Sequence, residues 1–91
     1  MRVYLIDVTT HPATIRIGNY NRSKDKKIAD VDVIHGTNGA SWNEHRTWNK
    51  EMMYTSFKGA KQFLSNYYIS KGQLDIAKYF AELVEEDYDF G

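Results

Sequence analysis

The residues best suited to chemistry lie close together in one short stretch of the chain. This stretch, HGTNGASWNEHRTW, begins at position 35 and holds two of the three histidines and both tryptophans. His35, Glu44 and His45 could bind a divalent cation, because imidazole and carboxylate groups are common metal ligands. Glu44 and His45 are adjacent, however, so on a helix their side chains would point about 100° apart. The i, i+4 spacing of helical metal ligands is missing, and we expect neither a metal site nor a cofactor.

The same stretch resembles the ββα-metal nuclease motif through DVIHG, NGASWNEH and WNK. In that motif a histidine at the end of a strand is the general base, and a metal ligand lies on the helix that follows. The resemblance implies that His35 activates water and that Asn43 orients it. His45 or Asn49 would then hold the cation. A metal-dependent nuclease using His35 and His45 is therefore one alternative function.

The tetrapeptide SWNE supports a structural interpretation of the same stretch. Ser41 can accept a hydrogen bond from the backbone N–H of Glu44, and Glu44 can reach back to the N–H of Ser41, which is a capping box. The pattern predicts a loop followed by a short helix from Trp42 to about Lys50. Because Ser41 is then a cap, and because no phosphate-binding glycine motif is present, we assign no catalytic residue and expect no enzyme.

Hydrophobic periodicity predicts the elements around this stretch. Alternating apolar residues predict three strands, at 2–8, 13–20 and 28–35. Apolar residues at helical spacing predict two helices on either side of Gly72, which form an αα-hairpin. We therefore expect one α+β domain over residues 1–91. It comprises a three-stranded antiparallel meander (1–35), a helical part in which a short helix precedes the αα-hairpin packed on one sheet face (41–86), and an acidic tail (87–91).

The predicted αα-hairpin, YYISKGQLDIAKYFAEL, resembles one tetratricopeptide unit. It has a tyrosine four residues before Gly72, an alanine five residues after it, and then Phe80. The resemblance covers about a fifth of the chain and implies helix–turn–helix geometry, without the repeats that a solenoid needs. The core is expected to contain Val3, Leu5, Ile15, Ile17, Val31, Val33, Phe57, Ala60, Leu64, Ile76, Phe80 and Leu83.

Composition limits the class of protein. The chain has 91 residues and no cysteine, which excludes disulfides, thiolate metal sites and cysteine nucleophiles. Small domains without disulfides suit a reducing compartment, and no apolar run approaches the roughly 20 residues of a membrane span. We expect a cytoplasmic protein with no membrane association, either monomer or homodimer.

Charge is unevenly distributed although the net charge is zero. Residues 82–91 carry five acids and no base, whereas the rest carries all twelve bases. Such asymmetry is typical of interaction segments. The first alternative to a protein-binding function, ahead of the nuclease, is nucleic-acid binding. It would use the basic residues of one loop and one helix face, which are Arg22, Lys24, Lys26, Lys27, Lys58 and Lys61.

The absence of a convincing catalytic set favours a binding function. Aromatic residues and arginine are frequent anchors of protein interfaces. We therefore expect a small non-catalytic module that binds a larger protein stoichiometrically, as an inhibitor or modulator. Small inhibitors made by viruses and mobile elements against nucleic-acid-processing proteins have this build, which is a fold-level analogy. The expected partner-binding residues are Trp42, Arg46, Tyr54, Glu82, Glu85, Glu86, Asp87 and Asp89.

Overall fold

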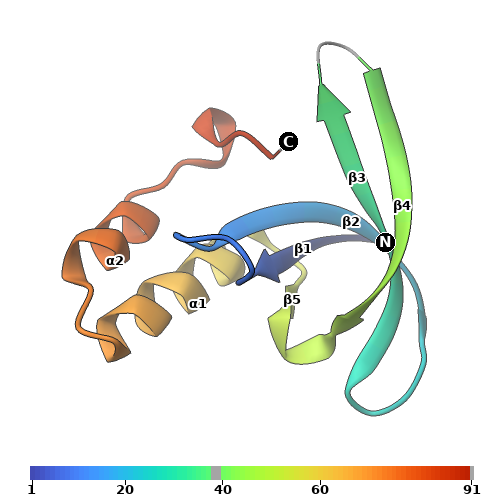
Figure 1. The fold of residues 1–91 in the computed structure, drawn as a ribbon, viewed down its shortest axis with the longest axis horizontal. Helices are drawn as coiled ribbons and strands as arrows, with labels where there is room; N and C mark the ends of the chain where they lie inside the picture. Colours follow the sequence, from blue (N-terminus) through green and yellow to red (C-terminus); the bar gives the residue numbers. More distant parts are fainter. Residues whose placement is uncertain (38–39, 91) are drawn as a thin grey trace.

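The structure, a computed structural model, describes residues 1–37 and 40–90. Its five antiparallel strands form one sheet in the order β4-β3-β2-β1-β5 (Figure 1). Their bounds are Arg2–Asp7 (β1), Thr14–Ser23 (β2), Ile28–Thr37 (β3), Ala40–Asn49 (β4) and Met53–Tyr54 (β5). The helices are Phe57–Ser70 (α1) and Leu74–Ala81 (α2), with short 3₁₀ helices at Lys50–Met52 (η1) and Glu85–Asp87 (η2). The α+β class is confirmed, with five strands where three were predicted.

The predicted short helix from Trp42 to Lys50 is wrong, because most of that segment is strand β4. The strand pairs with β3 along its whole length, from Ile28↔Asn49 to Thr37↔Ala40. A capping box contributes only about 1 kcal/mol, which is less than a ten-residue ladder with a buried tryptophan provides. The helical turn starts later, at η1, where the side chain of Asn49 accepts a hydrogen bond from Glu51 N at 2.8 Å.

The sheet is curled because its two edge strands are nearly consecutive in the chain. Only three residues, Lys50–Met52, link β4 to β5. The edges of a flat five-stranded sheet lie about 19 Å apart, whereas the chain from Asn49 to Met53 spans at most about 14 Å. Gly18 allows the curl because it has no side chain. A Cβ atom at this position would lie only 2.9 Å from both the backbone oxygen of Asp32 and Leu5 Cδ1, which is too close.

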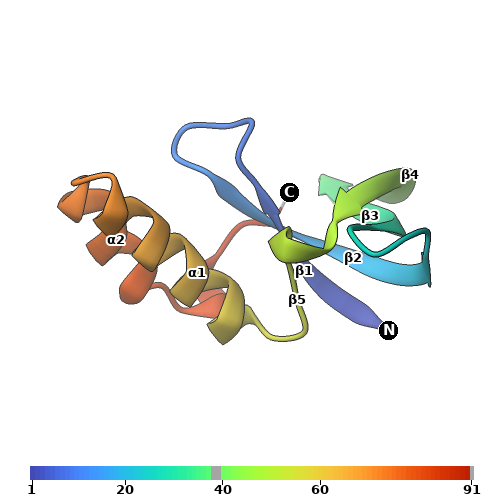
Figure 2. The same cartoon turned by 90° about the horizontal axis from the view of Figure 1, so that it is seen from below.

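The curl divides the core into two clusters on opposite faces of the sheet. On the concave face, Val3 and Leu5 of β1 pack with Val31, Val33 and Trp48. On the outer face, Tyr4 and Ile6 of the same strand pack against the two helices, which lie on that side only (Figure 2). The outer cluster is completed by Ala13, Ile15, Phe57, Ala60, Leu64, Tyr68, Ala77 and Phe80.

Most of the predicted core and the predicted αα-hairpin are confirmed. Helices α1 and α2 pack together and are joined at Gly72, whose φ of 74° suits glycine. Three predicted core residues, Ile17, Ile76 and Leu83, are only partly buried. Val31 and Val33 are buried away from the helices, because the curled sheet covers its own concave face. Among the described residues, no helix is long and apolar enough to cross a membrane.

Candidate functional site

The chemistry-bearing stretch forms the two faces of the β3–β4 hairpin. Successive side chains of a strand point to opposite faces, so the even-numbered residues of β4 share the concave side. The register places Trp42 beside His35, Glu44 beside Val33, and Arg46 beside Val31. We call Trp42, His35, Glu44 and Arg46 the Trp42 surface.

The centre of this surface is a stacked pair of rings. The indole of Trp42 lies on the imidazole of His35, with ring centroids 5.2 Å apart and planes 17° from parallel. The Nε2 atom of His35 is 2.9 Å from Glu44 Oε1, which fixes the imidazole in turn. Trp42 nevertheless stays 53% exposed, whereas the side chain of His35 is mostly covered. The structure therefore holds a large aromatic ring in a defined position at the surface.

Arg46 and Trp48 continue the same face toward the core. The guanidinium carbon of Arg46 lies 5.0 Å from the ring centroid of Trp48, in a cation–π contact. Trp48 itself is buried in the concave cluster. The two tryptophans thus have different environments on one strand, because Trp48 lies where the sheet curls over its concave face and Trp42 lies near the Thr37↔Ala40 end of the β3–β4 ladder.

His45 faces the other side of the hairpin, among acidic residues. Its Nδ1 atom is 3.4 Å from Asp32 Oδ1, and its Nε2 atom is 3.8 Å from Asp30 Oδ1. Asp30 also accepts a 2.8 Å hydrogen bond from Arg22 Nε, and this bond holds the pKa of Asp30 below its ordinary value. The polar cluster pairs its charges internally and stabilises the register of β2, β3 and β4.

The structure separates the two histidines of the nuclease alternative. His35 and His45 lie on opposite faces of a two-stranded ladder, so a general base at His35 and a cation held by His45 would not face the same substrate. In the described part of the chain, no group of three histidine, aspartate or glutamate residues is placed to hold a metal ion. The resemblance to the ββα motif therefore ends at the sequence, because the segment expected to supply its helix is β4.

The residues predicted to bind a partner occupy three separate surfaces. Trp42 and Arg46 lie together on the Trp42 surface. Tyr54 lies on the outer face instead, paired with Tyr4 and in ring contact with Phe63 of α1. The acidic residues form the third surface, beyond α2, and include Glu82, Glu85, Glu86, Asp87 and Asp89.

The acidic segment is held against the sheet rather than extended into solvent. The N–H of Ile15 donates a 2.7 Å hydrogen bond to the hydroxyl of Tyr88, and the hydroxyl of Tyr4 donates to Glu85. The ring of Phe90 packs on Phe57 with centroids 5.8 Å apart. The five acidic residues of the segment are nevertheless exposed, Glu85 included. We call residues 82–90 the acidic strap; its partly buried aromatic residues hold it, and its acidic residues are exposed.

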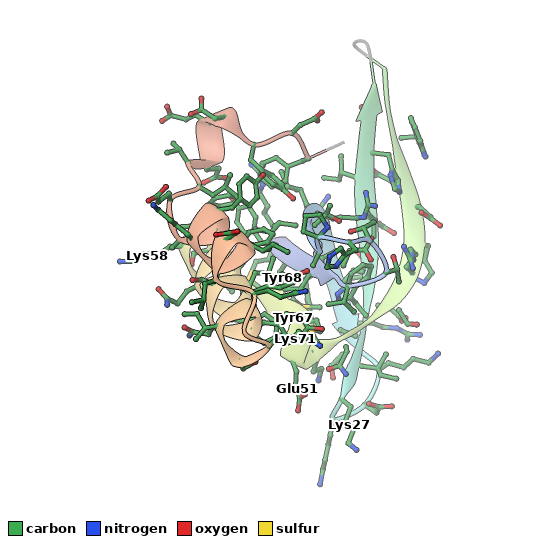
Figure 3. The ribbon with its side chains drawn as sticks, turned by 60° about the vertical axis from the view of Figure 1, so that its left-hand side comes forward. Lys27, Glu51, Lys58, Tyr67, Tyr68 and Lys71 are labelled. Carbon is green, nitrogen blue, oxygen red and sulfur yellow. The ribbon has the colours of Figure 1, made fainter. Side chains whose placement is uncertain are left out.

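The basic residues of the nucleic-acid alternative do not form one strip. Arg22, Lys24, Lys26 and Lys27 lie at the β2–β3 turn, where Lys50 joins them by donating to Ser23 Oγ. Lys58 and Lys61 lie on α1 at the opposite side of the molecule, as the positions of Lys27 and Lys58 in Figure 3 make clear. Lys61 also donates to the backbone oxygen of Leu83 at 2.9 Å, so it helps to hold the acidic strap.

Two surface grooves lie away from the Trp42 surface. One open groove of about 510 Å³ lies along α1 and is lined by Tyr54, Phe63, Tyr67 and three small or amide residues. A second groove, between the β1–β2 turn and the end of α1, contains His11 and Lys71 (Lys71 is labelled in Figure 3). Lys71 there lies over the ring of Tyr67, with its Nζ atom 4.8 Å from the ring centroid.

Comparisons of the chain with protein-family models, curated proteins and solved structures gave no match.

Proposed function

We propose that the chain is a small protein-binding module that acts without catalysis, and that the Trp42 surface makes the principal contact. The observation that carries this proposal is the exposed indole of Trp42, stacked on His35 and fixed through Glu44. A side chain that is already ordered loses little conformational entropy when it binds. Tryptophan and arginine are also the residue types that most often dominate binding energy, and Arg46 lies on the same face.

The chemistry of this surface indicates what the partner must offer. An apolar cleft would take the indole, and a carboxylate beside it would meet Arg46. The exposed carboxylates of the acidic strap favour a partner with a basic area, and a protein that handles nucleic acid has one. We therefore propose a stoichiometric inhibitor or modulator of such a larger protein.

Affinity capture with matched variants tests the proposal. The tagged chain is used as bait in an extract of the cells from which the sequence comes, and bound proteins are quantified by mass spectrometry. Trp42→Ala should lower recovery of the specific partner at least about tenfold, as expected for an interface anchor. Tyr79→Ala is the control, because Tyr79 on α2 is another exposed aromatic residue, at 50% against 53% for Trp42.

Two results would contradict the proposal. Equal loss of the partner with both variants would show that the Trp42 surface has no special role. Retention with Trp42→Ala, combined with loss when Lys24, Lys26 and Lys27 are replaced by alanine, would favour the basic turn and the nucleic-acid alternative. Treating the extract with nuclease before capture separates a protein contact from one bridged by nucleic acid.

A further inference from the structure

The two edges of the sheet differ in how they are protected. Strand β5 is two residues long and is followed directly by the segment leading into α1, so it offers little backbone for pairing. Strand β4 is ten residues long and pairs only with β3 among the described strands. Figures 1 and 2 both place β4 on the outside, with the helices beyond the other end of the strand order. A long open edge presents unpaired N–H and C=O groups to another strand.

The sequence of β4 lacks three of the devices that block such an edge. Its ten residues, ASWNEHRTWN, contain no proline and no lysine, and all its paired positions with β3 run without a bulge. Residues 41–47 are exposed. Proline, lysine and bulges are among the features that keep natural edge strands apart. The charges that β4 does carry on its concave face, Glu44 and Arg46, are opposite in sign, so they repel a second copy only in some registers.

We propose that β4 is a dimer interface, at which β4 of a second copy of this chain pairs antiparallel across a two-fold axis at His45. Both copies then turn the same face of the sheet to the same side. Even-numbered residues of one copy therefore lie opposite even-numbered residues of the other, and odd-numbered residues lie opposite odd-numbered ones. With the axis at His45, Glu44 of each copy lies opposite Arg46 of the other. Trp42 of each copy lies opposite Trp48 of the other.

Charge complementarity selects this register over its neighbours. Moving the axis to position 44 would place Glu44 of one chain opposite Glu44 of the other. Moving it to position 46 would place the two Arg46 residues opposite each other. Like charges directly opposite destabilise a strand pair, and opposite charges and aromatic pairs stabilise it. At the axis itself, the two His45 residues lie opposite each other. Each imidazole is 3.4 Å from the Asp32 carboxylate of its own chain, and this negative charge reduces any repulsion between the two imidazoles. The pairing joins two sheets into one and brings both Trp42 surfaces to one face.

Sedimentation equilibrium from micromolar to millimolar concentration tests the interface. The native chain should dimerise. Glu44→Arg and Arg46→Glu should each raise the dimer dissociation constant about tenfold or more, because each variant places like charges at both pairs. An equimolar mixture of the two variants should restore association, since the arginines of one chain then meet the glutamates of the other.

A matched charge pair elsewhere is the control. Lys78 and Glu82 form an exposed i, i+4 contact around the end of α2, so Lys78→Glu and Glu82→Arg should leave association unchanged. Circular dichroism of every variant confirms that it is folded. A native chain that stays monomeric at millimolar concentration overturns the proposal, and so does a mixture of the two β4 variants that associates no better than either alone. Partner capture through Trp42 is a separate readout, so each proposal can fail by itself.

Discussion

Replacing Trp48 by alanine is expected to lower the free energy of unfolding by about 3–5 kcal/mol, the range for removing a buried aromatic residue. Trp48 is 9% exposed and closes the concave cluster under Arg46. The free energy of unfolding of a domain of this size is roughly 5–14 kcal/mol in total, so the variant should be close to unfolding. Urea denaturation followed by circular dichroism measures the change.

Trp42→Ala is the control for this prediction, because both tryptophans lie on the same face of β4. Trp42→Ala should lower the free energy of unfolding by less than about 1 kcal/mol, since the exposed indole contacts mainly His35. If the two substitutions changed stability equally, the described path of β4, with one tryptophan buried and the other exposed, would be wrong.

Deleting residues 85–91 is expected to lower the free energy of unfolding by about 3–7 kcal/mol. The deletion removes two partly buried rings, Tyr88 and Phe90, each contributing about 1–2 kcal/mol. It also removes the hydrogen-bond partners of Ile15 N–H and the Tyr4 hydroxyl, each bond contributing about 0.5–1.5 kcal/mol. Thermal and urea unfolding of the truncated chain measure the loss.

Neutralising the strap without removing its rings separates charge from packing. Glu86→Gln combined with Asp87→Asn changes two exposed carboxylates and should alter stability by less than about 0.5 kcal/mol. A truncated chain as stable as the native one would contradict the packing of the strap. Tests of the strap as a contact for a basic partner should therefore use the neutralised variant, because truncation also perturbs the fold.

The strands β1, β2 and β3 and the αα-hairpin could be predicted because each has strong local periodicity. In β1, Val3 and Leu5 alternate with Tyr4 and Ile6; apolar residues at both sets of positions are typical of a strand that is buried on both faces, as β1 is. What periodicity could not supply was the division of the core into two clusters. That division depends on the curl, which follows from the short link between the two edge strands.

Strand β4 was missed because a local capping signal was given more weight than alternation. Trp42 and Trp48 are six residues apart, which separates them on a helix but places them on one face of a strand. The Asn38-Gly39 pair preceding the strand is also a strong sequence signal for a hairpin. These two signals together could have predicted β4 and hence the opposite directions of His35 and His45.

The acidic strap was missed for a different reason. Its five acids dominate the composition of the last ten residues and conceal the alternation of Tyr88 and Phe90 with exposed carboxylates. The contact of Tyr88 with Ile15 N–H joins residues 73 positions apart, and no local pattern predicts such a pairing. Trp42 and Arg46 could be proposed from residue type alone, whereas their shared face required the β3–β4 register.

Amide hydrogen exchange followed by mass spectrometry tests most directly the claim that this chain meets other molecules through β4. It is measured on the dilute chain, on the concentrated chain and on the chain with its captured partner. We expect slower exchange in residues 41–47 on association, with unchanged exchange in α1, α2 and the β2–β3 turn. Protection confined to the helices or to that turn, with β4 exchanging as fast as in the dilute chain, would contradict the account.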